Sequence, residues 1–464
     1  MLNPNICQQA RLSRDPRFDG KFFIAVKTTG IFCRTICPAR LPLEKNVEYF
    51  ETAHDALQAG FRPCLRCHPD SLPNSAQWDN KRYRLNKIIR LLESGDVEDK
   101  KLYQLSNELN ITPRYLRKIF AEQFGLSPKK YQLHYKCALA KQLLEETLLP
   151  IGEIAYACEF SSISLFNNTF KAHFGFTPGS LRKQASSVNK HESVPQHIRL
   201  TLRYQSNYDW SAFLKFQQLR LIDGLETING QSYQRNIIYQ GVKGSFSMTP
   251  HPKEHAFYVT ISLDEWRVLS AVLTNIRRMF DLDTNLSAIE RLIKQKLPDF
   301  PLHSGLRIPG CWESFEAGIR AICGQQISVV AASKLVTQIT QLASEPKPDG
   351  GFYFPTTEQL ANFDFNPLRT TTRRKETLKL FSEYCHTNEA YNELDNWRTI
   401  KGIGSWTIDY AKLRSQGAPD VWLSSDLGIK NALEHYQQTH SAIDIEAFRP
   451  WRSYIGLQLW AYQF

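Results

Sequence analysis

Apolar side chains recur at helical spacing in two matching stretches of the chain. The segments FAEQFGLSP (120–128) and FKAHFGFTP (170–178) coincide in their Phe, Gly and Pro positions at an offset of 50 residues. In each copy a shorter apolar segment (102–109 or 151–158) comes first, and a polar turn follows it. Two short helices joined by a tight turn form a helix-turn-helix. The pattern therefore predicts a pair of helix-turn-helix units within residues 80–185.

Capping residues mark both ends of the second helix in each unit. In the first copy Thr112 precedes a proline, and in the second copy either Ser161 or Ser162 stands at the equivalent place. Hydroxyl side chains at the start of a helix accept hydrogen bonds from its free N–H groups. Each helix ends at a glycine, Gly125 or Gly175, which tolerates the left-handed conformation of a helix end.

The remainder of the chain follows a different pattern. The segments TLRYQ, QSYQRNIIYQ and HAFYVTISL predict strands with short helices within 199–264, and the pattern from 265 to 464 is mostly helical. Polar stretches ending the first 80 residues and spanning 186–198 are typical of linkers. We therefore expect a multi-domain, mainly α protein: a small α+β domain (1–75), an all-α domain (80–185), and an α+β then all-α domain (199–464).

Charge is distributed unevenly along the 464 residues, whose formal net charge is +11. Residues 1–185 hold 27 Lys and Arg against 18 Asp and Glu, while residues 186–464 hold 30 against 28. A basic N-terminal part favours a nucleic-acid partner contacted through its phosphates. No apolar run reaches membrane-spanning length and no signal peptide is evident, so we expect a cytoplasmic location without membrane contact.

Four of the ten cysteines are clustered with the spacing of a metal site. Cys33 and Cys37 form one close pair, and Cys64 and Cys67 form the other. Two close thiol pairs predict one tetrahedral zinc site. The zinc could be purely structural or could also activate a thiolate. We interpret the other six cysteines as small buried or neutral residues: Cys7, Cys137, Cys158, Cys311, Cys323 and Cys385.

The residues around this cluster distinguish the two roles. RDPRFDGKFFIAVKTTGIFCRTICPAR and NVEYFETAHDALQAGFRPCLRCHPD closely resemble the N-terminal domain of the Ada family over about residues 7–70. The resemblance implies that Cys33 accepts a methyl group from a DNA methylphosphotriester, that all four cysteines bind the zinc, and that the zinc is both structural and activating. Zinc keeps a thiol deprotonated and nucleophilic at neutral pH. Methyl transfer consumes the cysteine, so this activity is a single turnover.

Charge at the thiolate cluster predicts a switch in DNA affinity. Four thiolates around Zn²⁺ carry a formal charge of about −2, which falls to about −1 when one sulfur becomes a thioether. Weaker repulsion of phosphates should then raise the affinity for DNA. Candidate phosphate contacts are Arg34, Arg40, Arg62 and Arg66.

The two helix-turn-helix units resemble the AraC family of transcription activators. The resemblance implies two recognition helices, about 113–124 and 162–174, in neighbouring segments of the DNA major groove. Outward polar residues can read base edges or contact phosphates. The candidates are Arg114, Tyr115, Arg117, Lys118, Ser164, Asn167, Asn168 and Lys171.

Several landmarks in the last segment resemble the AlkA glycosylases of the helix-hairpin-helix superfamily. They are YDWSAFLKF, RIPGCWESFEAGIRAICGQQISV, IKGIGSWTIDYAKLR, VWLSSDLGIK and RPWRSY. The resemblance implies that Asp426 is the catalytic carboxylate, because breaking an N-glycosidic bond builds positive charge on the sugar. Gly402 and Gly404 would form a hairpin that contacts a DNA phosphate. Asp426 could otherwise serve only as a helix cap, and the hairpin only as a DNA-binding element.

The same resemblance implies the shape of the base site. Aromatic walls suit a flipped, cationic methylated purine, and the matching positions are Phe216, Trp406, Tyr410 and Trp451. Lyase-active members carry a lysine where Trp406 stands, so we expect a monofunctional hydrolase. Gln326 stands at the position of the apolar wedge that fills the gap left by the flipped base, and Leu427 replaces an expected aromatic residue.

These features predict a cytoplasmic fusion that senses and repairs DNA alkylation. Its partners would be alkylated and promoter double-stranded DNA, with RNA polymerase as a further candidate, and we expect a monomer. No Pro-Cys-His-Arg segment of the O6-alkylguanine transferase type is present. Two alternatives remain: a methylation-sensing regulator whose C-terminal part only binds DNA, and a glycosylase whose zinc module is only structural.

Overall fold

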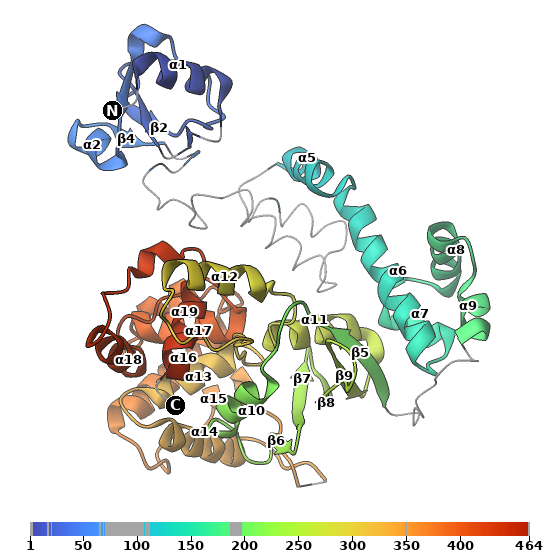
Figure 1. Cartoon of the computed structure of the whole chain (residues 1–464). Helices are drawn as coiled ribbons and strands as arrows, with labels where there is room; N and C mark the ends of the chain where they lie inside the picture. The colour runs from blue at the N-terminus through green and yellow to red at the C-terminus, as the bar shows by residue number, and fades with distance from the viewer. Residues whose placement is uncertain are drawn as a thin grey trace. The chain divides into compact units, whose positions relative to one another are not determined.

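The computed structural model describes residues 3–15, 18–19, 21–64, 66–67, 69, 106, 112–185, 197–348 and 350–462. The chain divides into two compact units, Met1–Ile89 and Arg90–Phe464, and Figure 1 labels their elements. Apart from residue 106, the predicted helix over 102–109 lies outside the described residues, as do most of the two predicted linkers. Within the described ranges, no helix is both long and apolar enough to cross a membrane.

The first unit is a small α+β fold built on a four-stranded sheet of order β3-β1-β2-β4. Side chains of β1 alternate between two cores, with Phe23 and Ala25 in one and Ile24 in the other. This alternation is the two-residue period of a strand buried on both faces. Its elements are α1 (Pro4–Ser13), β1 (Phe23–Val26), β2 (Ile31–Cys33), η2 (Glu44–Asn46), β3 (Val47–Phe50), α2 (Ala53–Gln58) and β4 (Arg62–Pro63).

The second unit begins with the helical segment, whose predicted caps are confirmed. Thr112 accepts a hydrogen bond from the backbone of Tyr115, and Ser162 does the same for the second copy. Gly125 and Gly175 end their helices with φ of +67° and +82°. The pattern did not predict the long connecting helix α6, because its apolar residues are spread around the helix. The helices are α5 (Pro113–Phe124), α6 (Pro128–Glu146), α7 (Ile151–Ala157), α8 (Ile163–Phe174) and α9 (Pro178–Ala185).

A five-stranded antiparallel sheet of order β5-β9-β8-β7-β6 follows, and helix α10 (Trp210–Gln218) connects β5 to β6 along the chain. The three predicted strands are present. Strands β6 and β8 were not predicted. The sequence of β6, ETIN, is short and largely polar, whereas that of β8, VKGSFSMTP, does alternate, with Val242, Phe246 and Met248 buried. The strands are β5 (Ile198–Arg203), β6 (Glu226–Asn229), β7 (Ser232–Tyr239), β8 (Val242–Pro250) and β9 (Ala256–Leu263).

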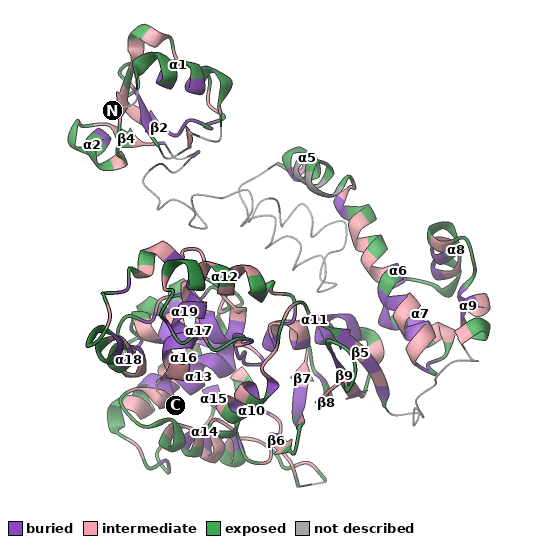
Figure 2. Cartoon of the chain, viewed as in Figure 1, coloured by how far each residue is buried: buried purple, intermediate pink, exposed green. Residues whose placement is uncertain are grey.

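The rest of the second unit is helical, as expected, and Figure 2 shows its buried interior around α13, α17 and α19. Two apolar clusters form this interior, one centred on α13 and α16 and the other on α18 and α19. The elements are η3 (Trp266–Val268), α11 (Leu269–Met279), α12 (Leu286–Lys296), α13 (Ser314–Gly324), α14 (Val329–Ala343), α15 (Thr357–Ala361), α16 (Thr372–Thr387), η4 (Leu394–Thr399), α17 (Ser405–Gln416), α18 (Leu427–Gln437), η5 (Ile445–Phe448) and α19 (Arg452–Tyr462).

A buried ion network fixes the sheet against helix α13. Arg235 of β7 pairs with Glu226 of β6 at 2.6 Å and with Glu316 of α13 at 2.5 Å. Arg320, also on α13, pairs with both carboxylates. Removing one partner of such a network leaves an uncompensated buried charge, which costs several kcal/mol (about 3–5). The network therefore holds α13, and the loop that follows it, in one place relative to the sheet.

Candidate functional site

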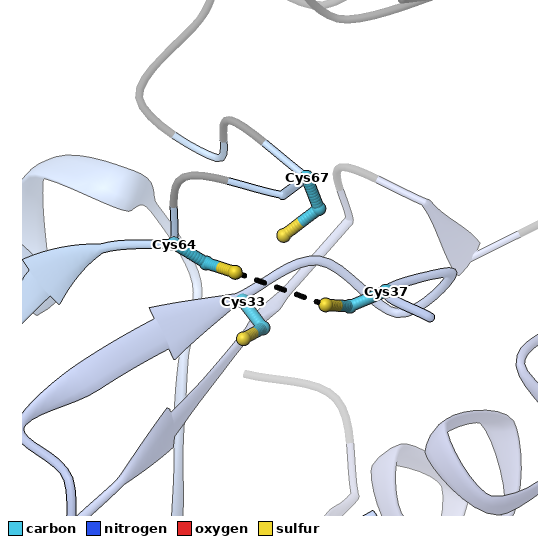
Figure 3. Close-up of side chains that lie close together, drawn as sticks. All are labelled: Cys33, Cys37, Cys64 and Cys67. Atoms are coloured by element: carbon cyan, nitrogen blue, oxygen red, sulfur yellow. Dashed lines mark hydrogen bonds between the residues drawn. The ribbon is translucent and has the colours of Figure 1, made fainter. Parts of the chain in front are cut away.

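Four thiols converge at the edge of the first unit's sheet. Figure 3 shows the side chains of Cys33, Cys37, Cys64 and Cys67 pointing toward one another. Their sulfur atoms all lie within 4.8 Å of one another, and the sulfurs of Cys37 and Cys64 are 3.9 Å apart. Four thiolates at such spacing are the donor set of tetrahedral zinc, so the residues fit one zinc ion.

Pairing of strands β2 and β4 explains how the two cysteine pairs meet. The strands are parallel, with Phe32 opposite Pro63. Cys33 ends β2 and Cys64 directly follows β4, so the two pairs start at the same edge of the sheet. The backbone N–H of Cys64 donates to the carbonyl of Phe32 at 3.0 Å, which fixes this register.

Exposure separates Cys33 from its three partners. Cys37, Cys64 and Cys67 are each 7% exposed, whereas Cys33 is only half-buried. A thiolate that attacks a DNA methyl group must be reachable from solvent. The sulfur of Cys33 itself lies in the buried cluster with the other three, so its role as the methyl acceptor stays a prediction.

Among the four candidate phosphate contacts, the structure corrects Arg34. Its side chain is buried, pairs with Asp19 and donates to the carbonyl of Cys67. A guanidinium used in this way supports the thiol cluster instead of facing DNA. The other three candidates, Arg40, Arg62 and Arg66, are exposed.

Polar residues predicted for the recognition helices lie mostly on accessible surfaces of α5 and α8. Arg114, Tyr115, Arg117 and Lys118 of α5 are exposed, as are Ser164, Asn168 and Lys171 of α8, and Asn167 is partly buried. Apolar positions of the same helices are buried, including Leu116, Phe166 and Phe170. The six cysteines outside the thiol cluster are also buried, as expected.

A cavity of about 1590 Å³ opens in the helical part of the second unit. Its lining brings together segments far apart in the sequence, from α10, the loop after α13, the turn before α17, the start of α18 and the end of α19. The predicted residues Phe216, Gln326, Trp406, Tyr410 and Asp426 are among the lining residues. Trp451 is not. It lies just before α19 and packs partly buried against the core, so its place in the base pocket stays a prediction.

Two indole groups hold the carboxylate of Asp426. Trp460 donates from Nε1 to Oδ1 at 2.9 Å, and Trp406 donates from Nε1 to Oδ2 at 3.3 Å. Oδ1 also accepts the backbone N–H of Ile429, so Asp426 caps α18 as well. Hydrogen bonds to both oxygens fix the plane of the carboxylate. The sequence did not single out Trp460; its only signal was an aromatic residue in an apolar helix close to the last landmark, RPWRSY.

Aromatic rings line the cavity beside this carboxylate. Trp406 and Tyr410 stack with centroids 5.2 Å apart. Phe216 differs, because the guanidinium of Arg220 lies 3.6 Å from its ring centroid. Burial lowers the pKa of Arg220 to about 10, which still leaves it charged at neutral pH. The guanidinium of Arg414 lies 5.0 Å from the ring centroid of Phe216 and 5.5 Å from that of Tyr410, so positive charge adjoins both rings.

The hairpin before α17 needs glycine at one of its two predicted positions. Gly402 has φ of +92°, and a Cβ there would lie 2.1 Å from Oγ1 of Thr377. Gly404 has an ordinary backbone conformation, and its Cβ would meet nothing within 4 Å. Gly404 is exposed, which leaves the backbone open to a phosphate. Lys401 pairs with Glu376 at 2.9 Å and is not among the cavity-lining residues.

The loop after α13 carries the predicted wedge position. Gln326 is exposed at the mouth of the cavity and has φ of +57°. A residue other than glycine rarely adopts this conformation unless its surroundings impose it. Here the neighbouring Gln325 is fixed by hydrogen bonds to the carbonyl of Gly402 and to Thr407. These contacts tie the loop to the hairpin next to the exposed Gln326.

Family models match three parts of the chain. The metal binding domain of Ada matches residues 6–70, a helix-turn-helix domain matches residues 105–184, and the AlkA N-terminal domain matches residues 199–313. A probable bifunctional transcriptional activator/DNA repair enzyme AlkA of Mycobacterium tuberculosis is 30% identical, over 98% of this chain and 95% of that protein. This chain belongs to that AlkA family of bifunctional proteins.

Two further relatives each match one part of this AlkA family member. The DNA-3-methyladenine glycosylase 2 of Escherichia coli is 31% identical over 56% of this chain and 96% of its own length. The bifunctional transcriptional activator/DNA repair enzyme Ada of Escherichia coli is 38% identical over 29% of this chain, a match that spans 37% of Ada. The chain thus combines an Ada-like zinc region, a helix-turn-helix region and a glycosylase region.

Proposed function

We propose that this chain repairs alkylated DNA and activates the transcriptional response to alkylation. Residues 199–464 would act as a monofunctional DNA-3-methyladenine glycosylase of type II, and residues 1–75 as a single-turnover acceptor of methyl groups from methylphosphotriesters. Residues 80–185 would bind promoter DNA. The observation that carries the proposal is the Asp426 carboxylate, held by two indole N–H groups inside a large aromatic-lined cavity.

Base release would proceed by hydrolysis at the sugar. The flipped base enters the cavity and stacks on Trp406 and Tyr410. The bond between C1′ and the base nitrogen breaks, and its electron pair leaves with the base. Asp426 stabilises the positive charge that develops on the sugar, and a water oxygen then bonds to C1′ while its proton passes to the carboxylate or to solvent. Lys401 is paired outside the cavity, which fits a product left as an intact abasic site.

Methyl repair would use the sulfur of Cys33. Its lone pair attacks the methyl carbon of the phosphotriester, an S–C bond forms, the C–O bond breaks, and a phosphodiester anion leaves. When bound to the four cysteines, zinc supplies the charge that keeps the sulfur a thiolate at neutral pH. The resulting thioether carries no negative charge, so the cluster repels DNA phosphates less than before. We propose that this change raises DNA affinity and switches on transcriptional activation.

Partners and location follow from this proposal. Double-stranded DNA, alkylated or carrying a promoter, is the partner, and the exposed arginines and lysines of α5 and α8 would contact it. A monomer in the cytoplasm that recruits RNA polymerase would satisfy the activator role. A regulator without excision activity is the second candidate, and it is favoured only by Gln326 and Leu427, which depart from the glycosylase pattern.

Base release from methylated duplex DNA tests the glycosylase. The wild-type protein should free methylated purine and leave an unbroken strand, and Asp426→Asn should reduce the rate at least about a hundredfold. Asp299→Asn, an exposed aspartate outside the cavity lining, serves as the matched control. Absence of base release from the wild type would establish the regulator instead.

Mass spectrometry after incubation with DNA containing methylphosphotriesters tests the acceptor. The wild type should gain one methylene located on Cys33, and Cys33→Ser should gain none. A gain on another cysteine, or no gain in the folded wild type, would leave the zinc with a structural role only. Base release by Cys33→Ser should equal that of the wild type.

A further inference from the structure

The edge of the five-stranded sheet is covered by helix α6. Strand β5 is the last strand of the sheet and pairs only with β9 among the described strands. The outward N–H of Thr201 donates to Oε2 of Glu146 at 2.6 Å, and its carbonyl accepts from Nε2 of Gln142 at 2.9 Å. Two side chains one helical turn apart thus take the place of a neighbouring strand. Exposed strand edges otherwise invite pairing with other chains.

Apolar packing continues the same contact away from the strand edge. One uninterrupted core includes Leu143 and Ile154 of the helix-turn-helix segment together with Leu200 of β5 and Val268 of η3. Helix α7 packs against η3, and α6 packs against β5. Tyr135 of α6 also lies within hydrogen-bond distance of Thr274 of α11, at 3.4 Å between the hydroxyl oxygens. Continuous burial of this kind resembles the inside of a domain more than a contact between mobile domains.

The contact leaves the DNA-reading side of the segment free. It uses α6 and α7, while Ser164, Asn168 and Lys171 of α8 are exposed. Burial of Glu146 raises its pKa, which agrees with a carboxylate removed from water at the contact.

We infer that the second helix-turn-helix unit is permanently docked on the glycosylase part, with α6 as the cover of strand β5. The partner that fits this sheet edge is therefore the chain's own DNA-reading segment. Helix α8 and the cavity around Asp426 then belong to one rigid body. DNA held by α8 is presented to the cavity in one orientation only. This contact would exist whether or not the proposed activities at Cys33 and Asp426 are correct.

A split chain tests the dock in the complete protein. A protease site inserted between residues 190 and 191 allows the folded chain to be cut, and size-exclusion chromatography then reports whether residues 1–190 and 191–464 stay together. We expect co-elution at micromolar concentration. Separation of the two halves, each with its helical circular dichroism intact, would overturn the dock.

Paired variants test whether α6 is the cover. Gln142→Ala with Glu146→Ala removes both hydrogen bonds to Thr201 and should weaken association of the cut halves about tenfold or more. Lys141→Ala with Glu145→Ala changes an exposed pair on the same helix and should leave association unchanged. Hydrogen exchange of residues 199–203 in the uncut chain should quicken only in the first variant. Equal association and equal exchange in both variants would refute the role of α6.

Discussion

Cys33 ends strand β2 of a small sheet, whereas Asp426 begins helix α18 in a cavity whose lining runs from residue 209 to residue 461. The three partners of Cys33 lie within 34 residues of it, and all are thiols. Those of Asp426 are indoles from α17 and α19, 20 and 34 residues away in sequence. A shared metal organises the first centre, and packing of several helices organises the second.

This difference determines what each centre depends on. The thiol centre needs its zinc and little else, because a domain of this size has a small core of its own. The carboxylate needs the whole frame of the second unit, including the buried ion network that fixes α13. Perturbations should therefore act on one centre and spare the other.

Removal of zinc should have the largest effect. It should abolish the activity of the thiol centre and leave the activity of the Asp426 centre unchanged. Zinc bound by cysteines contributes about 10–16 kcal/mol to folding, which matches or exceeds the stability of most domains. A chelator should abolish methyl acceptance at Cys33 and unfold the first unit. Base release should persist, since no cysteine is among the described lining residues of the cavity. Both activities can be measured on one sample, and added zinc should restore the first.

Loss of base release on chelation would contradict the independence of the two centres. That result would mean that the second unit depends on the metal or on the folded first unit. Chelation that left methyl acceptance intact would instead contradict the role of zinc in activating Cys33.

Trp460→Phe should have the next largest effect, because it keeps a ring and removes the N–H that holds Asp426. Loss of a hydrogen bond to a charged group costs about 1.5–3 kcal/mol, so kcat for base release should fall about 10- to 100-fold. Trp406→Phe should cost less, since its hydrogen bond is longer, at 3.3 Å against 2.9 Å. Trp422→Phe, in the same core but outside the cavity lining, is the control.

A change in KM without a change in kcat would contradict the positioning role of Trp460. It would assign this indole to base stacking alone. The two roles are thus separated by steady-state kinetics on one methylated substrate.

Sequence patterns predicted what local chemistry determines. The caps at Thr112 and Ser162 and the terminal glycines depend on neighbours a few residues away, each cysteine pair is likewise local, and the structure has them. The two pairs, which have 26 residues between them, were joined in the prediction by the ligand number of zinc. Trp460 escaped prediction, because its contact with Asp426 is set by the packing of α19. Arg34 was misplaced for a similar reason, since its partner Asp19 lies on another segment.

Resemblance to families supplied the landmarks but not the position of every side chain. RPWRSY drew attention to Trp451, whereas the indole that reaches the cavity is nine residues further along, on α19. Strand β8 carries the two-residue alternation of a strand, with Val242, Phe246 and Met248 buried, and it lies between β7 and β9. Long-range packing accounts for the position of Trp460, whereas the pattern of β8 was present in the sequence.

Replacement of Glu313, which precedes α13, should have a smaller effect, on the stability of the helices that hold the cavity. Burial, followed by the nearby Glu316, raises its pKa from 4.5 to about 7. The folded state then holds a proton that the unfolded state releases, so this contribution to stability is complete below pH 4.5 and is lost as the pH rises through 7. Glu313→Gln should match the wild type at pH 5 and be more stable by about 1–3 kcal/mol at pH 8.

Thermal unfolding of the second unit at both pH values measures this effect, with Glu389→Gln at an exposed site as control. Equal destabilisation of wild type and variant between pH 5 and pH 8 would refute the burial of the Glu313 charge. The thiol centre should show no difference between Glu313→Gln and wild type at either pH.

Gln326 should give the smallest effect, and it tests whether the mouth of the cavity fills the gap left by a flipped base. Gln326→Leu replaces the amide with a branched apolar side chain one atom shorter, so desolvation in the base stack costs less. About 1 kcal/mol of added apolar burial corresponds to roughly a fivefold faster base release at low substrate concentration. Gln326→Gly relieves the backbone at φ +57° but leaves the gap empty, and it should slow release by a similar factor. Fluorescence of 2-aminopurine placed opposite the lesion reports the same step without catalysis. If both variants match the wild type in rate and in fluorescence, residue 326 does not enter the duplex, and the exposed side chain of Leu427, beside the catalytic carboxylate, becomes the group to change next.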